Sequence, residues 1–458
     1  MYTVLRLLIV HACVALLVCT LPVPVTHART DLQPPTGSAS NKALWTEAVD
    51  LGGGWKWLDW FGYFNTSHDP WVYHAQHAWM YAVGDIASNI YLYSTDLGWL
   101  WTGQNFYPWM YRFSGSDWIW YLPGSSGPRW FYNGTTGLWE NDDAGAAYYV
   151  SAAGSDDADG LSPSTAFLTI NKALSVVRPG ESVYILPGEY NESMEINGLG
   201  DGTATISVKG VPGLTVLDGQ NTLTFSLFCE QCAGLVFDDL ILRDYTDIGI
   251  AVGMSSDITF RDLKVYDNGA AVQLVGWELE GYGIHVENSS DVLIEANEVY
   301  RNGPNPPVFP DRLLGTGINT YAITNGVIRN NRSYANHGGG ILVEDSVNVL
   351  VEGNTVFSND LDATVDEWWD GGLWLDGGRD VTVRGNVFRH NLGPGIEISD
   401  EDDQNPTGYV LEGNVSTGNY FGIYIWNFGT AGWPDPSILS RTNNDFSGNS
   451  RGDVWIQP

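Results

Sequence analysis

The chain has 458 residues, of which 54 are acidic and 21 are basic, and its formal net charge is −33. Apolar residues make up 43% of the chain, which is enough to bury a core, so the acidity does not mark a disordered tail. Nucleic acid and anionic membrane surfaces are excluded as partners, because both are bound through Lys and Arg.

Residues 1–28 have the features of a secretory signal peptide. Arg6 precedes a mostly apolar run over 7–21, and Thr26-His27-Ala28 provides a cleavage signature. The run is shorter than a membrane span, and no later stretch reaches the required length, so no transmembrane segment is expected in the mature chain. We expect a secreted or cell-surface protein, with the periplasm as the alternative compartment, and a linker over 29–44.

Only two cysteines remain after that segment, and they form the CxxC pair Cys229 and Cys232. A lone CxxC cannot supply the four thiolates of a structural zinc site. The pair therefore predicts a small-loop disulfide or two packed thiols, with a redox centre as the alternative.

Residues 45–139 hold 13 of the 20 tryptophans of the chain. Two short aromatic runs joined by a polar turn are typical of a β-hairpin, and the spacing predicts five such hairpins with shared aromatic faces. The period and the Gly-Trp and Trp-aromatic pairs resemble the cell-wall choline- and glucan-binding repeats. That resemblance implies a module that targets a glycan or a cell surface; the alternative is that the rings are core. The series at this period is Trp60, Trp79, Trp99, Trp118 and Trp139.

A second architecture begins after the acidic joint over 140–147. The chain continues with Tyr148-Tyr149-Val150-Ser151, an Asp-rich turn over 154–160, a short amphipathic helix over 169–177 and a strand beginning at residue 182. This opening resembles the N-terminal cap of the secreted right-handed parallel β-helix proteins, the pectate-lyase-like superfamily. It implies one β-helix domain over 148–458. Within the turn, Asp156, Asp157 and Asp159 are expected to be solvated, with Ca²⁺ binding as the alternative.

Two columns of asparagine allow the coils of this domain to be counted. Stacked Asn residues tolerate a left-handed backbone and hydrogen-bond to the next coil, and the minimal coil is 23 residues long. We predict an all-β chain: a right-handed parallel β-helix, which is a single-stranded solenoid, preceded by a module of Trp-rich β-hairpin repeats. The columns are Asn297, Asn331, Asn354, Asn386, Asn414 and Asn444, and Asn268, Asn302, Asn336, Asn359, Asn391, Asn419 and Asn449.

One column of the solenoid alternates in charge without a break. Opposite charges one strand apart attract, so this column predicts a structural salt-bridge ladder and removes its three arginines from the catalytic candidates. Its members are Asp238, Arg261, Glu295, Arg329, Glu352, Arg384 and Glu412.

The outward positions of the third strand of each coil carry carboxylate, amide, imidazole and aromatic groups, which are the groups that recognise sugars. Long insertions at 270–282, 304–316, 360–371, 400–408 and 427–440 flank this strand and predict the walls of a groove. In the pectate-lyase-like families the substrate groove lies on the corresponding sheet. The expected substrate-binding residues are His285, Glu287, Asn319, Tyr321, Trp374, Tyr424 and Trp426, with Trp368 and Trp369 from an insertion.

The catalytic candidates are carboxylates on that strand. Glu344 and Asp376 hold equal positions on successive coils, so their Cα atoms should be about 5 Å apart, and Glu397 lies diagonally one coil further. Such a pair can supply an acid together with a base or nucleophile. His337 is added because its Asn-His-Gly-Gly turn resembles the Gly-His-Gly turn of polygalacturonases. The alternatives are a solvated acidic face, or a Ca²⁺ cage completed by Asp370 or Asp400.

These residues predict a monomeric, secreted enzyme that acts on a polysaccharide. Glycoside hydrolase and polysaccharide lyase or epimerase both remain, although the strand lacks the Lys or Arg that uronate lyases use as a base, and other polygalacturonase signatures are absent. Four of the loops carry 12 acidic residues and one Arg, which favours a neutral glycan or a metal-dependent site. The alternative is a non-catalytic cell-surface protein that binds glycan or mediates adhesion.

Overall fold

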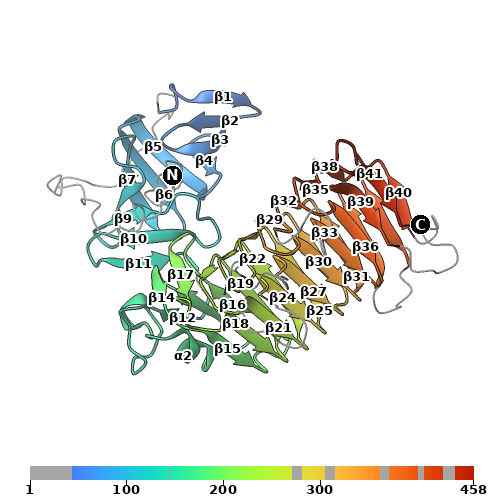
Figure 1. Cartoon of the computed structure of the whole chain (residues 1–458). Helices are drawn as coiled ribbons and strands as arrows, with labels where there is room; N and C mark the ends of the chain where they lie inside the picture. Colours follow the sequence, from blue (N-terminus) through green and yellow to red (C-terminus); the bar gives the residue numbers. More distant parts are fainter. Residues whose placement is uncertain are drawn as a thin grey trace, which may run out of the picture. The chain divides into compact units, whose positions relative to one another are not determined.

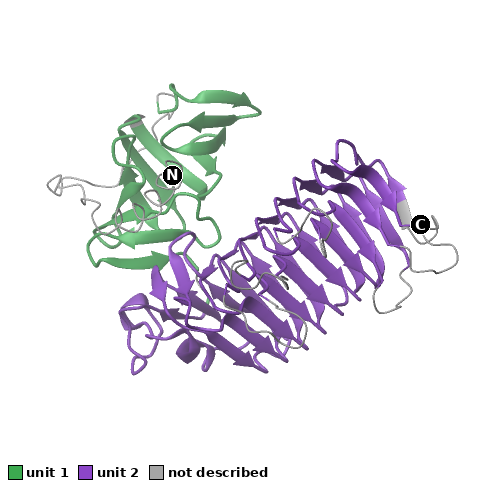
Figure 2. Cartoon of the chain, viewed as in Figure 1, with its two compact units in different colours: residues 1–145 green, residues 146–458 purple. Residues whose placement is uncertain are grey.

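The computed structural model describes residues 44–143, 145–270, 281–304, 315–361, 371–400, 407–426 and 439–457. The chain divides into two compact units, residues 1–145 and 146–458 (Figure 2). The predicted signal peptide lies outside the described residues. Within those residues, no helix combines the length and the apolar character that crossing a membrane requires.

The first unit is one antiparallel sheet whose described strands follow each other in chain order (Figure 1). The predicted hairpin repeats are therefore confirmed. The strands are β1 (Val49–Gly52), β2 (Trp55–Leu58), β3 (Gly62–His68), β4 (Trp71–His74), β5 (Ala78–Ile86), β6 (Asn89–Ser94), β7 (Gly98–Thr102), β8 (Trp109–Arg112), β9 (Asp117–Tyr121), β10 (Trp130–Asn133) and β11 (Leu138–Asn141).

The two faces of this sheet differ because side chains alternate along each strand. One face packs into a core that includes Phe64, Val72 and Leu92. On the other face, four successive hairpins place a Tyr opposite a Trp: Tyr73 and Trp79, Tyr93 and Trp99, Tyr111 and Trp118, Tyr132 and Trp139. Trp60, the first of the predicted series, differs: it lies in the turn between β2 and β3.

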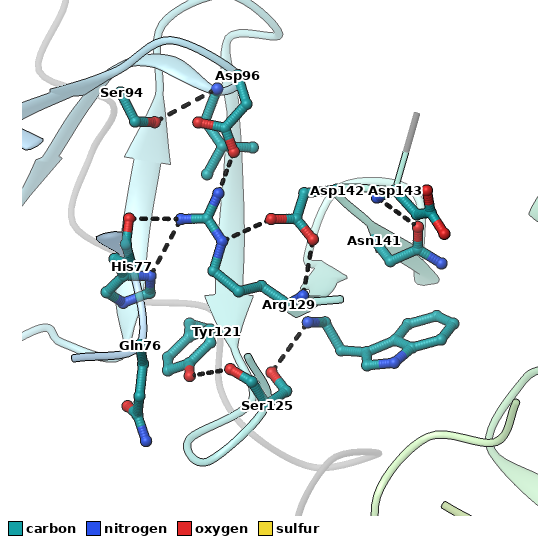
Figure 3. Close-up of polar contacts among 12 residues, drawn as sticks. Gln76, His77, Ser94, Asp96, Tyr121, Ser125, Arg129, Asn141, Asp142 and Asp143 are labelled. Carbon is teal, nitrogen blue, oxygen red and sulfur yellow. Dashed lines mark hydrogen bonds and ion pairs between the residues drawn. The ribbon is translucent and has the colours of Figure 1, made fainter. Parts of the chain in front are cut away.

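A buried polar cluster supports the core face (Figure 3). The Arg129 guanidinium donates to Asp142 Oδ2 over 2.7 Å and also bonds to Asp96, and it lies 3.3 Å from His77 Nδ1. His74 donates through Nε2 to the Phe61 carbonyl, while its Nδ1 accepts two backbone N–H groups. These bonds tie turns that are far apart in the sequence to one another.

The second unit is a solenoid of three parallel sheets. Its cap contains a 3-10 turn, η2 (Pro163–Thr165), and the helix α2 (Ile170–Leu174), shorter than predicted, whose N-cap Thr169 accepts from the Lys172 N–H. Sheet 1 contains β12 (Ala147–Val150), β13 (Ser182–Ile185), β16 (Ile206–Lys209), β19 (Ala233–Asp238), β22 (Ser256–Arg261), β25 (Ser290–Glu295), β28 (Val327–Arg329), β31 (Val347–Glu352), β34 (Arg379–Arg384), β37 (Tyr409–Glu412) and β40 (Leu439–Thr442).

The other two sheets complete each coil. Sheet 2 contains β14 (Gly188–Tyr190), β17 (Thr215–Asp218), β20 (Ile241–Arg243), β23 (Lys264–Tyr266), β26 (Glu298–Tyr300), β29 (Arg332–Tyr334), β32 (Thr355–Phe357), β35 (Val387–Arg389) and β38 (Val415–Thr417). Sheet 3 contains β15 (Met194–Asn197), β18 (Phe225–Glu230), β21 (Ile248–Gly253), β24 (Ile284–Glu287), β27 (Ile318–Tyr321), β30 (Ile341–Glu344), β33 (Leu373–Asp376), β36 (Ile396–Ser399), β39 (Phe421–Ile425) and β41 (Gly452–Ile456).

Side-chain ladders join successive coils. Both predicted Asn columns are confirmed: for example, Asn336 donates through its backbone N–H and its Nδ2 to Asn359 Oδ1, over 3.1 and 2.9 Å. In the charge ladder, Arg329 lies 2.7 Å from Glu295. Sheet 2 adds a stack of aromatic rings that was not predicted, formed by Tyr266, Tyr300, Tyr334 and Phe357.

The remaining sequence motifs of this unit are structural. Cys229 and Cys232 form a disulfide, as predicted. Asp156 accepts three hydrogen bonds from Leu168 and Thr169 at the start of α2, which holds the Asp-rich turn against the helix. The described residues contain no group of three or more His, Cys, Asp or Glu side chains arranged for a metal ion.

Candidate functional site

The strands of sheet 3 present two columns of outward side chains. In register, one column reads His285, Asn319, Leu342, Trp374, Glu397 and Tyr424, and the other reads Glu287, Tyr321, Glu344, Asp376 and Ser399. Between them, residues such as Ile284 and Val343 point into the core. Glu344 and Asp376 therefore face each other on neighbouring strands, and Glu397 is diagonal to Asp376.

Asp376 is the final acceptor in a chain of two hydrogen bonds. Trp374 Nε1 lies 2.5 Å from Ser399 Oγ, and that hydroxyl lies 2.6 Å from Asp376 Oδ1. An indole N–H only donates, so the Ser399 hydroxyl accepts a hydrogen bond from Trp374 and donates one to Asp376 Oδ1. Asp376 is 6% exposed. The chain thus orients a buried carboxylate as an acceptor.

Glu397 is held in a similar way on the next strand. It is 1% exposed, and its Oε1 accepts from Trp426 Nε1 over 2.5 Å. Tyr424 stands directly opposite Glu397 on β39, and burial together with the Glu397 charge raises the pKa of Tyr424. The Trp426 ring, which the sequence suggested for stacking on sugars, thus also positions a carboxyl group.

His285 and Asn319 form a second polar position, one strand apart. His285 Nδ1 and Asn319 Oδ1 are buried and have no hydrogen-bond partner among the residues that the structure describes. The Tyr282 ring stacks on His285 with a centroid distance of 5.0 Å, and burial lowers the pKa of His285 to about 4. A neutral imidazole beside an amide oxygen can be satisfied by hydroxyl groups, which donate as well as accept.

His337 does not lie on a strand of sheet 3. It occupies the turn that precedes β30, where its backbone N–H donates to the Asn302 carbonyl over 2.9 Å. Burial lowers the pKa of its imidazole, and Nδ1 has no partner among the described residues. The structure therefore places it beside the strand that carries Glu344, at the edge of the outward columns.

Other predicted residues have different outcomes. Trp368, Trp369 and Asp370 lie outside the described residues, as do most of the insertions that were expected to form groove walls. Asp400 follows β36 and is 5% exposed. Burial, Asp376 and Asp400 together raise the pKa of Tyr409, which places both carboxylates near one phenol. The Ca²⁺ site stays a prediction.

Ser399 was not among the site residues predicted from the sequence. The signal that could have found it is the register: Ser399 stands directly opposite Asp376 on the next strand, within reach of both its carboxylate and the Trp374 ring.

Comparison with known protein families supports the fold. A family model described as a right-handed beta helix region matches residues 248–450. Solved structures that resemble the chain include the pectate lyase Pel9A, with 16% identity over 67% of this chain and 79% of the lyase and a TM-score of 0.49. A rhamnogalacturonan lyase has 17% identity over 67% and 89%, with a TM-score of 0.49.

A lacto-N-biosidase from Eubacterium ramulus also resembles the chain, with 14% identity over 68% of each chain and a TM-score of 0.42. No curated protein matches. With TM-scores below 0.5, these similarities carry no conclusion about this chain. The matched segment and the three parallel sheets lead to the same conclusion: residues 146–458 form a right-handed parallel β-helix, as the resemblance to the pectate-lyase-like superfamily predicted.

Proposed function

We propose that this protein is a secreted glycoside hydrolase that cleaves a neutral polysaccharide on the outward face of sheet 3. The observation that carries the proposal is the hydrogen-bond chain from Trp374 through Ser399 to Asp376. It prepares a buried carboxylate as an acceptor, on a face that also offers further carboxyl groups and aromatic rings.

The carboxyl groups around Asp376 supply the chemistry of glycoside cleavage. Asp376 acts as the base or the nucleophile, and a neighbouring carboxyl group, Glu344 or Glu397, protonates the leaving oxygen. A proton is favoured on one member of such a group, because carboxylates this close repel each other when both are ionised. Trp374 and Trp426 fix the rotamers of the reacting groups through their N–H donors.

Charge supports a neutral substrate. The outward positions on the described strands β24 to β39 contain no Lys or Arg, and four of the loops beside them carry 12 acidic residues against one Arg. A polyuronate would be repelled there unless a cation intervened. Lysis or epimerisation of a uronate is the competing outcome, and Ca²⁺ is the cation that it would need.

The test is product analysis with the mature chain on neutral and uronate polysaccharides, each with and without EDTA. Hydrolysis produces reducing ends without new ultraviolet absorbance, whereas a lyase produces an unsaturated product that absorbs. A chain that binds these glycans but forms no product would be a binding protein. Loss of product with EDTA would reveal the metal.

Variants then assign the roles. Asp376→Asn should abolish product, with activity restored in part by azide if Asp376 is the nucleophile. The acid variant, Glu344→Gln or Glu397→Gln, should keep its activity on aryl glycosides whose leaving group needs no proton. Glu412→Gln, at an exposed position on sheet 1, is the matched control and should retain full activity.

We also propose that the N-terminal sheet targets the enzyme to glycan. Its outer face exposes Tyr63, Trp71 and Trp79 by 55%, 39% and 46%. Aromatic rings of this kind stack on the C–H faces of sugars. Removal of residues 29–145 should abolish retention on insoluble polysaccharide but preserve turnover of soluble substrate. Unchanged retention would contradict this role.

A further inference from the structure

The N-terminal sheet contains a concave pocket of about 540 Å³. Its wall combines residues of β1, of β2 and the turn after it, and of the loop between β7 and β8. Tyr107 of that loop packs against Trp60 with a centroid distance of 6.0 Å, which holds the loop beside the turn. The volume is within the range of small-ligand sites. The lining residues are Glu47, Val49, Trp57, Leu58, Asp59, Trp60, Gln104 and Asn105.

Trp57 differs from its neighbours on the outer face. Trp55, Trp71 and Trp79 each contact a Tyr ring edge to face, at interplanar angles of 70° to 89°. Trp57 contacts no other ring in the described part of the chain. It is half-buried and lines the pocket. One indole in this pocket thus keeps a face available to a ligand.

Trp60 contributes an unsatisfied donor. Its Nε1 is buried and finds no acceptor among the described residues. A buried donor without a partner is costly, so a small shift of the side chains that cover Nε1, which lets an occupant of the pocket offer an acceptor oxygen, is favoured. The Trp60 ring itself is fixed by Phe61 and Tyr107, at 5.2 and 6.0 Å.

The polar lining discriminates between ligand classes. Glu47 and Asp59 are its only ionisable members, so an anionic ligand is repelled. A cation would satisfy them but would give Trp60 no acceptor. Hydroxyl groups donate to the carboxylates and accept from the indole N–H, while Gln104 and Asn105 offer both functions.

We infer that this pocket binds a neutral sugar residue, with Trp57 stacked against its C–H face and Trp60 donating to a ring or hydroxyl oxygen. The inference rests on the proposed glycan-targeting role of the N-terminal sheet. It goes further by placing the binding in one pocket and by excluding charged ligands from it.

The test is isothermal titration of the full mature chain. The probes are neutral cello-, xylo- and manno-oligosaccharides, an oligogalacturonate as the anion and choline chloride as the cation. We expect at least one neutral series to bind and the two charged probes not to compete with it. Displacement of the sugar by choline or by oligogalacturonate would overturn the assigned chemistry.

Variants locate the binding. Trp57→Ala should weaken it about tenfold, and the exposed pair Gln104→Ala and Asn105→Ala should have a similar effect. Trp60→Phe keeps the ring packing but removes the N–H, and should weaken binding several-fold. Leu161→Ala, at an exposed position in the cap of the second unit, is the control and should change binding less than twofold. Near-ultraviolet circular dichroism checks that each variant is folded.

The outcomes separate this inference from the targeting role. If Trp79→Ala abolishes binding and the pocket variants do not, the pocket is wrong while the targeting role stands. If none of the neutral series binds to the wild-type chain, both are wrong.

Discussion

The two units use aromatic residues in opposite ways. On sheet 2 of the solenoid, Tyr266, Tyr300 and Tyr334 stack 4.7 and 4.8 Å apart with interplanar angles of 9° and 4°. On the N-terminal sheet, Tyr73 and Trp79 meet at 70° over 5.3 Å. In-register parallel strands give side chains the same direction, so each ring covers the next. In the antiparallel hairpins the paired Tyr and Trp rings meet at 55° to 70°, so neither ring covers the face of the other.

Within the solenoid, the columns of the scaffold also differ from the columns of the candidate site. In columns that repeat one residue type, such as the Asn ladders, each side chain hydrogen-bonds to the same residue type on the next coil. The outward columns of sheet 3 change residue type at every strand, and the hydrogen bond from Trp374 to Ser399 runs diagonally from one column to the other. A column with changing residues is where a ligand can complete contacts that neighbouring coils do not provide.

The largest effect on stability is expected in one of the Asn columns of the solenoid. Asn359→Ala removes the acceptor of two Asn336 donors that are fully buried, so unfolding free energy should fall by about 4 kcal/mol. Denaturant unfolding of the solenoid measures this. Asn348→Ala, which removes an exposed side-chain bond to Asn325, is the control and should cost less than about 1 kcal/mol. Equal losses would show that burial of the ladder is not what matters.

A smaller effect, in the N-terminal unit, depends on pH. Burial, with the Arg129 charge adding to it, lowers the pKa of His74 to about 4, below the 6.5 of an exposed histidine. The neutral form is preferred on folding, so this stability is complete above pH 6.5 and is lost as the pH falls towards 4. The loss is on the order of 3 kcal/mol.

Tryptophan fluorescence reports on this unit because residues 45–139 hold 13 of the 20 tryptophans. In unfolding followed at pH 7 and pH 4.5, His74→Gln should reduce the acid-dependent loss, whereas a substitution at the exposed His68 should preserve it. An acid-dependent loss that is unchanged in His74→Gln would assign it to other groups.

The next effect contrasts the two aromatic arrays directly. Tyr300→Ala removes a ring that is stacked on both sides, and we expect a loss of about 2–3 kcal/mol in unfolding free energy. Trp79→Ala removes a ring that is 46% exposed, and the loss should stay near 1 kcal/mol. If Trp79→Ala is as damaging as Tyr300→Ala, the open-face description of the N-terminal sheet is wrong.

The smallest expected effect is on catalysis, in the outward column of sheet 3 that contains Asp376 and Ser399. Ser399→Ala breaks the link between Trp374 and Asp376, and kcat should fall about tenfold, which corresponds to about 1.4 kcal/mol, while KM and stability change little. Ser399→Thr retains the hydroxyl and should restore most of the activity. An equal fall in kcat for both variants would indicate that the hydroxyl is not the relevant group.

Much of the solenoid was predictable because its period repeats. Asn354 and Asn386 are 32 residues apart, so once they are aligned, the strand ten residues before each of them is aligned as well, which pairs Glu344 with Asp376. The aromatic ladder of sheet 2 has the same offsets as the Asn columns and could have been found in this way.

Side-chain direction could not be predicted. That Trp426 donates to Glu397, and Trp374 to Ser399, depends on rotamers set by neighbouring strands rather than on register. Trp60 shows the limit of spacing: it fits the period of about 20 residues, yet the hairpin of β2 and β3 places it in the turn. The pocket that it lines depends on a loop more than 40 residues away.

The Asn ladders also make the length of the outward face of sheet 3 adjustable. Asn331 and Asn354 are 23 residues apart and are joined by the same bonds as every other pair in their column. Duplication of one such unit within the gene would add a coil whose upper and lower surfaces already fit. The face would lengthen by about 4.8 Å, so its length could evolve in discrete steps without redesign of the scaffold.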